Sequence, residues 1–493
     1  MSTATAFDTN VGSLLARLPA MPSRISADSR LIEAGDAFAA YPGTHSDGRA
    51  FIGDAIARGA GAILWDSSGF QWQHEWKLPH LAVDNLKAKL GAIADLIYGH
   101  PSRDLWMIGV TGTNGKTSCT HWIAEGLHAA GRRAAVLGTL GNGLLGALEP
   151  ATNTTPDAAL LHEMLRDFKA AGAQAVSMEV SSHGLDQGRV NGVAFDVALF
   201  TNLSRDHLDY HGSMAAYGAA KARLFAWPGL RVSIINADDP FGQRLLDSAR
   251  GSHRRVLTYG FAAADIVGSR LTASAAGLSF SVDTPWGKGE ISTRLVGAFN
   301  ASNLLAVLAA LLASDVALDN ALDFVGRAQP ALGRMQRLGG DGAPMVVVDY
   351  AHTPDALAKV LTALRGAVAH EGDLICVFGC GGERDRGKRP EMGRIAGELA
   401  DRVIVTSDNP RTEDPELIAS EIVHGIRDTG NRRYAVELDR SQAIVTAIGG
   451  AKMGDVVLLA GKGHEPYQET AGVKRPFLDA AHAERALVAW GAR

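Results

Sequence analysis

The order of apolar segments constrains the fold of this chain more than any other feature. From Leu105 onward, apolar runs of strand length alternate with helical patterns, and the runs read LWMIGV, AAVLGTL, AVSMEV, VALFTNL and VSIIN. Strands that alternate with helices predict a mainly parallel sheet covered by helices. Beyond residue 334 the alternation restarts with MVVVDY, LICVFG, RVIVTS, YAVEL and DVVLLAG, which predicts a second open α/β domain.

Two boundaries divide the chain into three expected domains. The first hundred residues hold short strand-like pieces and a helical segment at 84–98, and they end at His100-Pro101-Ser102. The residue before a proline is pushed out of the helical region, so this tripeptide marks a boundary. A second boundary falls near 331–334, after expected antiparallel hairpins at 271–295 and a helix at about 303–313. The expected domains are residues 1–101, 102–334 and 335–493.

Composition excludes several classes of function. The 48 basic and 53 acidic side chains give a net charge of −5, which does not support a nucleic-acid or membrane surface. The three cysteines, Cys119, Cys376 and Cys380, cannot all pair and form no C-x-x-C, so a reduced cytoplasm is expected. No signal peptide is visible at the N-terminus, and the longest apolar run, 304–313, is too short to span a bilayer.

The segment MIGVTGTNGKTSCTHWIAEGL, which starts at Met107, predicts a strand, a glycine-rich turn and a helix. Gly112 and Gly115 allow a tight turn, after which the first amides of the helix point at a phosphate. Lys116 adds a cation and Thr117 a hydroxyl for Mg²⁺. The strict pattern G-x-x-x-x-G-K-[ST] is not met, because its first glycine would fall on Val110. The loop predicts ATP or GTP binding but does not distinguish kinase, ATPase, motor and ligase.

Three further segments carry chemical groups. Glu179 ends an apolar strand, where a carboxylate can hold the magnesium that bridges phosphates or, alternatively, cap a helix. The stretch DHLDYH, from Asp206 to His211, favours magnesium over zinc if ATP brings its own magnesium. Lys221 lies on a helix of small residues, which hints at a crowded site, although an isolated lysine is usually on the surface.

The segment VIVTSDNPRTEDP, residues 403–415, places polar groups directly after an apolar strand. By itself it predicts a helix start at Asp408 or Asn409, because an Asx cap is followed by proline in the first turn.

Taken together, these segments resemble a known family. GTNGKTS, TNTTP (152–156), EVSSHGL (179–185), NLSRDHLDYHG (202–212), AKARLF (220–225), GAFNASN (297–303), DYAHTPDAL (349–357), DNPR and GKGHE (461–465) occur in that order. The chain resembles the Mur ligases of bacterial cell-wall synthesis over nearly its whole length. The resemblance implies a small N-terminal α/β domain that binds UDP, a central P-loop-type domain with a parallel sheet that binds ATP, and a C-terminal Rossmann-like domain that brings the incoming amino acid.

The resemblance also implies the roles of particular residues in the reaction centre. The implied catalytic residues are Lys116, Glu179, His207 and Lys221. The magnesium ligands, for two ions, are Thr117, Glu179, His207 and Lys221, the last as a carbamate formed with CO₂. The implied ATP contacts are Gly112, Thr113, Asn114, Gly115, Lys116, Thr117, Ser118, Asn300, Arg334 and Asp349, with His352 as a weaker candidate.

Two other sets would bind the remaining substrates. The UDP-muramoyl-peptide contacts are Ser29, Thr44, His45, Ser46, Asn153, Thr154, Thr155, Ser181, Gln187 and Arg189. The contacts to the incoming amino acid, which the DNPR segment implies is meso-2,6-diaminopimelate, are Arg384, Asp408, Asn409, Pro410, Arg411, Gly461 and Glu465. Arginine at a strand end can distinguish diaminopimelate from lysine, which lacks the second carboxylate.

The implied reaction is ATP-dependent amide formation on UDP-N-acetylmuramoyl-L-alanyl-D-glutamate, in the cytoplasm and by a monomer. Three alternatives remain open. A motor or transporter ATPase shares the phosphate loop but gives no use for Lys221, GKGHE or DNPR. Folylpolyglutamate synthetase shares the ligase core, but the N-terminal domain and DNPR argue against it. A non-enzymatic sugar-nucleotide-binding regulator would not need the magnesium ligands.

Overall fold

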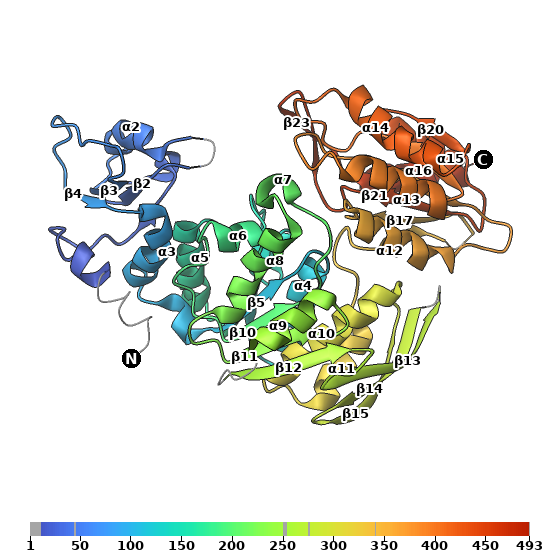
Figure 1. Cartoon of the computed structure of the whole chain (residues 1–493), viewed down its shortest axis with the longest axis horizontal. Helices are drawn as coiled ribbons and strands as arrows, with labels where there is room; N and C mark the ends of the chain where they lie inside the picture. The colour runs from blue at the N-terminus through green and yellow to red at the C-terminus, as the bar shows by residue number, and fades with distance from the viewer. Residues whose placement is uncertain (1–10, 44–45, 250–253, 275–276, 341, 493) are drawn as a thin grey trace.

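The computed structural model describes residues 11–43, 46–249, 254–274, 277–340 and 342–492, which form three sheets with helices packed on them and a separate β-hairpin. Figure 1 shows the N-terminal part at one end, the central part in the middle and the C-terminal part beside it. None of the described helices is long and apolar enough to cross a membrane.

The N-terminal part contains a parallel sheet of order β1-β2-β3-β4. Its strands are β1 (Ile25–Ser26), β2 (Ala37–Ala40), β3 (Ala62–Asp66) and β4 (His80–Val83). Its helices include α2 (Ile52–Ala57) and α3 (Leu86–Ile97), with short 3₁₀ turns η1 (Ser29–Leu31), η2 (Gly48–Phe51) and η3 (Pro101–Asp104). The helix expected at 84–98 is therefore confirmed as α3. Its apolar side shares a core with helix α5 (Ala158–Ala170) of the central part.

The central sheet has the order β15-β14-β13-β12-β11-β10-β5-β9-β6-β7-β8. The strands from β12 to β6 in that order are parallel, as the apolar runs predicted, and antiparallel hairpins extend both edges. The strands are β5 (Trp106–Thr111), β6 (Ala134–Gly138), β7 (Gly141–Leu144), β8 (Ala147–Glu149), β9 (Ala175–Glu179), β10 (Val197–Phe200), β11 (Val232–Asn236), β12 (Arg255–Gly260), β13 (Ile266–Ser274), β14 (Gly277–Thr284) and β15 (Gly287–Thr293).

Helices cover both faces of this sheet. Helices α4 (Lys116–Ala129) and α10 (Ala298–Ala313) pack on one face, and α5 packs on the other. The remaining helices are α6 (Ser182–Asp186), α7 (Leu208–His211), α8 (Met214–Ala222), η4 (Arg223–Ala226), α9 (Pro240–Ala249) and α11 (Leu318–Arg327). Helix α10 begins five residues before the expected start at residue 303, and nearly all of it is buried, which explains its apolar sequence.

The C-terminal sheet has the order β16-β17-β21-β18-β19-β20, and only β16 is antiparallel to its neighbour. Its strands are β16 (Gln336–Gly339), β17 (Met345–Asp349), β18 (Leu374–Phe378), β19 (Arg402–Val405), β20 (Tyr434–Val436) and β21 (Val456–Ala460). Helices α12 (Pro354–Arg365), α13 (Lys388–Leu399) and α14 (Pro415–Asp428) pack on one face, and α15 (Arg440–Gly449) and α16 (Asp479–Gly491) on the other. A two-stranded hairpin, β22 (Tyr467–Thr470) and β23 (Val473–Pro476), follows β21.

The helix start expected at Asp408 or Asn409 is wrong. Helix α14 begins at Pro415, and the side chain of Asp414 caps it by accepting a hydrogen bond from the backbone N–H of Glu416. The same combination of an acidic cap and a proline in the first turn occurs twice in this segment, and the second occurrence starts the helix. Residues 408–411 form a loop instead, at the carboxyl end of β19.

Candidate active site

The glycine-rich turn joins β5 to α4, as the sequence predicted. Gly112 lies against the next strand end so closely that an added Cβ would be 1.8 Å from Oγ1 of Thr201, and its φ is +149°. Gly115 has a φ of +85° and directly precedes α4. The first backbone N–H groups of α4 have no acceptor within the helix, so they can bind an anion beside the end of β5.

Two lysines meet at this turn. Lys116 Nζ donates hydrogen bonds to the carbonyl oxygens of Gly112 and Thr113, at 2.8 and 2.7 Å. Lys221 comes from helix α8 and is 1% exposed, and its Nζ donates to the same Gly112 oxygen at 2.7 Å. Burial, and then the charge of Lys116, lowers the pKa of Lys221 well below its usual value. The crowded site that the small residues around Lys221 indicated is therefore confirmed, because the lysine is buried.

A hydroxyl group and a carboxylate lie next to each other at the start of α4. The hydroxyl of Thr117 donates to Glu179 Oε2 at 3.1 Å, and Glu179 is 1% exposed at the end of β9. Oε1 of Glu179 accepts from the backbone N–H of Thr139 at 2.8 Å, so the carboxylate is fixed. Magnesium bound to nucleotide phosphates usually takes one or two protein oxygens and keeps several waters. The Thr117–Glu179 pair fits that requirement.

His207 lies on the loop that follows β10. Its φ is +54°, and its Nε2 is 3.3 Å from Oδ2 of Asp206. Burial lowers the pKa of His207 to about 3, although Asp206 opposes the shift, so the imidazole is neutral at physiological pH. Among the described residues, no cluster of three or more His, Cys, Asp or Glu side chains is arranged to hold a metal ion.

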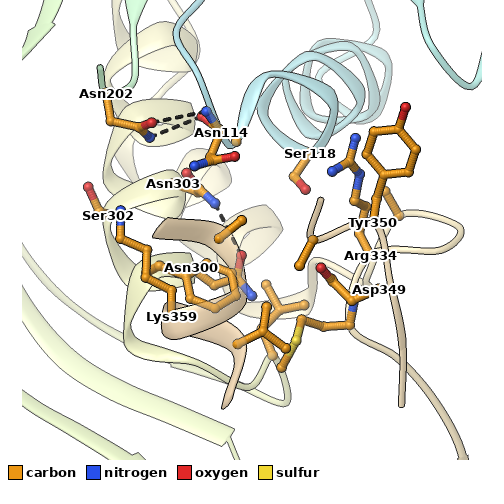
Figure 2. A pocket seen from close by; sticks show the side chains of 18 of the residues that line it. Asn114, Ser118, Asn202, Asn300, Ser302, Asn303, Arg334, Asp349, Tyr350 and Lys359 are labelled. Atoms are coloured by element: carbon orange, nitrogen blue, oxygen red, sulfur yellow. Dashed lines mark hydrogen bonds between the residues drawn. The ribbon is translucent and has the colours of Figure 1, made fainter. Parts of the chain in front are cut away.

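A cavity of about 260 Å³ opens beside the phosphate loop, between the central and C-terminal parts. Figure 2 shows its polar side chains pointing inward from both parts. Of the expected ATP contacts, Asn114, Gly115, Ser118, Asn300, Arg334 and Asp349 line it. Gly112, Thr113, Lys116 and Thr117 are not in its lining and belong to the phosphate loop next to it.

Sequence reasoning missed much of the cavity wall. Oδ1 of Asn202 accepts a hydrogen bond from the backbone N–H of Asn114, and Nδ2 of Asn202 donates to the Asn114 carbonyl oxygen, both at 3.0 Å (Figure 2). These two bonds fix the phosphate loop. Asn303 donates to Asn300 Oδ1 at 3.2 Å. These asparagines lie within quoted motifs, NLSRDH and GAFNASN, and that placement was the available signal. The other lining residues not expected include Trp122, Asn236, Asp238, Asp239, Phe299, Ser302, Tyr350 and Lys359.

Several of the expected UDP-muramoyl-peptide contacts form one connected group beside Glu179. The Thr155 hydroxyl donates to the Glu179 carbonyl oxygen at 2.9 Å and is 3.0 Å from Oγ of Ser181. Arg189 donates to the Thr155 carbonyl oxygen at 2.9 Å and to Oε1 of Gln187 at 2.8 Å. Thr154 joins them through Thr139 Oγ1, and Asn153 is its chain neighbour.

The N-terminal contacts are less complete. Ser29 is buried at the start of turn η1, and Ser46 accepts a backbone hydrogen bond from Gly43. Thr44 and His45 lie outside the described residues. No contact joins Ser29 or Ser46 to the group around Thr155 among the interactions of the described chain, so the uridine assignments stay predictions.

The expected amino-acid contacts lie at the carboxyl ends of neighbouring strands. Asp408 and Asn409 follow β19 and are 7% and 4% exposed, and Gly461 follows β21. Asn409 donates to Glu465 Oε2 at 2.8 Å, and Lys462 donates to the same oxygen at 3.0 Å. Oδ1 of Asp408 is buried without a hydrogen-bond partner. A buried carboxylate oxygen with no donor is suited to an ammonium group of a ligand.

Two arginines, Arg411 and Arg384, are also among the expected amino-acid contacts. Arg411 donates to the Gly382 carbonyl oxygen at 2.7 Å, and its backbone has a φ of +55°. Arg384 follows β18 on the neighbouring loop and donates to the Glu383 carbonyl oxygen at 3.4 Å. Pro410 is buried between Asn409 and Arg411. All seven expected residues thus lie on the loops that follow three adjacent strands, β21, β18 and β19.

A chain of contacts connects the phosphate loop to this group. Arg334 donates to Oγ1 of Thr117 at 3.0 Å, and its guanidinium lies 4.4 Å from the ring centre of Tyr350. The Tyr350 hydroxyl is 3.5 Å from Oε1 of Glu465, which binds Asn409 through its other oxygen. A second contact across the two parts joins the Asn114 amide to Asp355 at 2.9 Å. The nucleotide loop and the amino-acid loop therefore border one continuous site.

Comparison with known proteins agrees with this geometry. Residues 23–98 match the Mur ligase family catalytic domain, residues 110–311 the Mur ligase middle domain, and residues 333–463 the Mur ligase glutamate ligase domain. The chain belongs to the Mur ligase family.

Its relatives include enzymes with one particular name. UDP-N-acetylmuramoyl-L-alanyl-D-glutamate–2,6-diaminopimelate ligase of Chromobacterium violaceum is 52% identical over 481 residues, 97% of each chain. The enzyme of the same name from Pseudomonas aeruginosa is 51% identical over 468 residues, 94% of this chain and 95% of its own. A solved structure with that name superposes with a TM-score of 0.67 and 40% identity, and covers 95% of each chain.

Proposed function

We propose that this chain is an ATP-dependent amide ligase that joins meso-2,6-diaminopimelate to the D-glutamyl residue of UDP-N-acetylmuramoyl-L-alanyl-D-glutamate. The observation that carries the proposal is the continuous site that runs from Thr117 through Arg334 and Tyr350 to Glu465 and Asn409. A phosphate loop alone would serve a hydrolase equally well. A second, buried recognition site in contact with the loop is what a ligase needs.

The first step activates the acceptor. An oxygen of the D-glutamyl side-chain carboxylate attacks the γ-phosphorus of ATP, the bond to the β-phosphate oxygen breaks, and ADP leaves with an acyl phosphate formed. The chain contributes position and charge: the α4 amides and Lys116 bind phosphate oxygens, and Thr155, Ser181 and Arg189 hold the peptide near Glu179. Magnesium, held by Thr117 and Glu179 through the nucleotide, would neutralise charge on the phosphates.

The second step forms the amide. The neutral amine of diaminopimelate attacks the acyl carbon, inorganic phosphate leaves with the oxygen taken from the carboxylate, and the nitrogen loses a proton. Asp408, Asn409 and Glu465 would bind the other ammonium and carboxylate groups of the amino acid, and Arg411 the far carboxylate. The contacts between Asn114 and Asp355 and between Arg334 and Tyr350 keep the two parts together while the acyl phosphate exists, which helps to exclude water.

Lys221 has a separate proposed role. Burial lowers the pKa of Lys221, which favours the neutral amine, and only a neutral amine can bond to the carbon of CO₂ and lose a proton to give an anionic carbamate. Beside Lys116, such an anion would offset a cation and supply oxygen ligands for a second magnesium ion.

In the same proposal, residues 1–101, 102–334 and 335–493 act as the uridine, ATP and amino-acid domains of a monomeric cytoplasmic enzyme of peptidoglycan precursor synthesis.

Phosphate release from ATP tests the proposal. The purified chain, ATP, Mg²⁺ and UDP-N-acetylmuramoyl-L-alanyl-D-glutamate should release little phosphate until meso-diaminopimelate is added. L-Lysine, L-alanine and glycine serve as parallel additions. If no amino acid stimulates release, the ligase proposal fails; if L-lysine works as well as diaminopimelate, the specificity assigned to Arg411 fails.

A further inference from the structure

The loop 408–411 is held by a segment in which Glu465 is the one residue of the expected amino-acid site. This segment, residues 462–471, comprises the loop after β21 and strand β22 of the hairpin, and we call it the clamp. Figure 1 shows the hairpin, marked by β23, at the margin of the C-terminal part, away from its central strands. The clamp contacts the backbone or side chain of every residue from Ser407 to Arg411 except Pro410.

Backbone pairing fixes Arg411. The Arg411 N–H donates to the Glu469 carbonyl oxygen at 3.1 Å, and the Ala471 N–H donates to the Arg411 carbonyl oxygen at 2.6 Å. Arg411 and Thr470 thereby form an isolated parallel bridge. A non-glycine residue with a φ of +55° is strained and persists only where its surroundings hold it. The clamp is what holds this arginine, and hence the direction in which its guanidinium leaves the backbone.

Side chains of the clamp fix the rest of the loop. The Gln468 amide nitrogen donates to the carbonyl oxygens of Ser407 and Asp408, at 3.2 and 2.9 Å. Lys462 is fully buried and donates to Oδ1 of Asn409 at 3.1 Å. The same Asn409 oxygen accepts from the backbone N–H of Glu469 at 2.9 Å, so the amide group of Asn409 has one orientation. The clamp thus satisfies carbonyl and amide groups of the loop, and Lys462 Nζ also lies 3.8 Å from Oδ1 of Asp408. Arg411 uses one guanidinium nitrogen to donate to the Gly382 carbonyl oxygen, and its other nitrogens can bind a ligand.

We infer that Gln468 and Lys462 are positioning residues for the incoming amino acid, and that they set the preference for a second carboxylate by fixing the shape of the loop 408–411. This inference rests on the proposed ligase function and extends it to residues that touch the loop rather than the substrate. Its physical basis is that a bidentate contact to a carboxylate tolerates little displacement of the guanidinium.

Gln468 offers a graded test. Gln468→Ala removes two hydrogen bonds to the loop, and KM for meso-diaminopimelate should rise about tenfold. Gln468→Glu keeps the size and shape of the side chain but replaces the donating amide with a carboxylate, which cannot donate to the two carbonyl oxygens and repels them. KM for meso-diaminopimelate should therefore rise further, to about thirtyfold above the wild-type value. The KM values for ATP and for the UDP-muramoyl-dipeptide should stay within about twofold, because the phosphate loop and the group around Thr155 make no contact with Gln468 in the described chain. The matched control is Gln442→Glu, the same change on an exposed position of α15 in the same part of the protein.

Lys462→Met is the second variant, and it should also raise KM for diaminopimelate and lower the ratio of kcat/KM for diaminopimelate over L-lysine. Unchanged KM values for diaminopimelate in both Gln468 variants would overturn the inference. A parallel rise of all three KM values, or loss of folding in Gln468→Ala as well as Gln468→Glu, would equally overturn it, since that pattern describes a purely structural residue. A wild-type protein without amino-acid-dependent turnover would contradict the proposed function itself, which separates the two failures.

Discussion

Lys116 and Lys221 donate hydrogen bonds to one acceptor, the carbonyl oxygen of Gly112, at 2.8 and 2.7 Å. Burial lowers the pKa of Lys221, and the nearby charge of Lys116 lowers it further. Lys116 also has a lowered pKa, chiefly from burial, but Glu179 and Asp206 oppose the shift. The pair therefore combines one lysine suited to phosphate with one suited to remain neutral and react.

Replacement of Lys221 tests that division. Lys221→Ala should lower kcat by about 100-fold or more, because it removes the amine that is proposed to carry the anionic, magnesium-binding carbamate. A short-chain carboxylic acid such as acetate, added to the variant, should restore part of the activity by taking the place of the carbamate. Lys288→Ala, at a lysine whose side chain is 80% exposed, is the control and should leave kcat unchanged. Full activity of Lys221→Ala would contradict the assigned role.

The close approach of Gly112 to the neighbouring strand end gives a second prediction. Gly112→Ala would place Cβ 1.8 Å from Oγ1 of Thr201, so the phosphate loop must move, and ATP affinity should fall at least tenfold. Gly131→Ala is the matched control, because Gly131 also has a positive φ, +85°, but meets nothing within 4 Å of the added methyl group. Nucleotide binding by calorimetry distinguishes them. Equal affinities for the two variants would show that the loop tolerates the displacement.

Arg411 should decide which amino acid is used. Arg411→Ala removes the guanidinium proposed to bind the far carboxylate, and kcat/KM for meso-diaminopimelate should fall by about 100-fold or more. The value for L-lysine, which has no such carboxylate, should change far less. Exposed Arg394 on α13 provides a control substitution, Arg394→Ala. Parallel losses for both amino acids would place the specificity elsewhere.

A buried ion pair behind the amino-acid loop predicts a stability effect. Arg440 and Asp479 are 2.7 Å apart with fully buried side chains, and Arg440 also donates to the Ala460 carbonyl oxygen at 3.0 Å. Asp479→Ala leaves a buried, unpaired guanidinium and should destabilise the C-terminal sheet by about 3–5 kcal/mol. Hydrogen exchange of the β21 amides measures this. Glu398→Ala, which breaks the exposed pair with Arg394, should cost less than about 1 kcal/mol; similar costs would contradict the prediction.

The sequence predicted the strands β5, β6, β9, β10 and β11 of the central sheet and β17, β18, β19 and β21 of the C-terminal sheet because each is a largely buried apolar run. It also placed Glu179, Asp408 and Gly461 at strand ends, where parallel sheets bring side chains together. The hairpin β22–β23 was not predicted because YQETAGVKRP is mostly polar and mostly exposed, and its bridge to the loop 408–411 involves a single residue, Arg411.

The same hairpin explains the wrong helix start at Asp408. Local capping signals compete with pairing partners that lie far away in sequence, and here the bonds from Glu469 and Ala471 hold the backbone of Arg411 outside the helical region. The cavity wall was likewise only partly predictable. Tyr350 and Asn303 reach it from elements 47 residues apart in sequence, and only the packing of the C-terminal part on the central part brings them together.

Isotope transfer tests the central claim most directly. The D-glutamyl side-chain carboxylate of the UDP-muramoyl-dipeptide is labelled with ¹⁸O, and the chain is supplied with ATP, Mg²⁺ and meso-diaminopimelate. A ligase that works through an acyl phosphate must move one labelled oxygen into inorganic phosphate for each amide formed, and mass spectrometry of the phosphate reads this out. Phosphate without the label, released from ATP by water alone, would contradict the account.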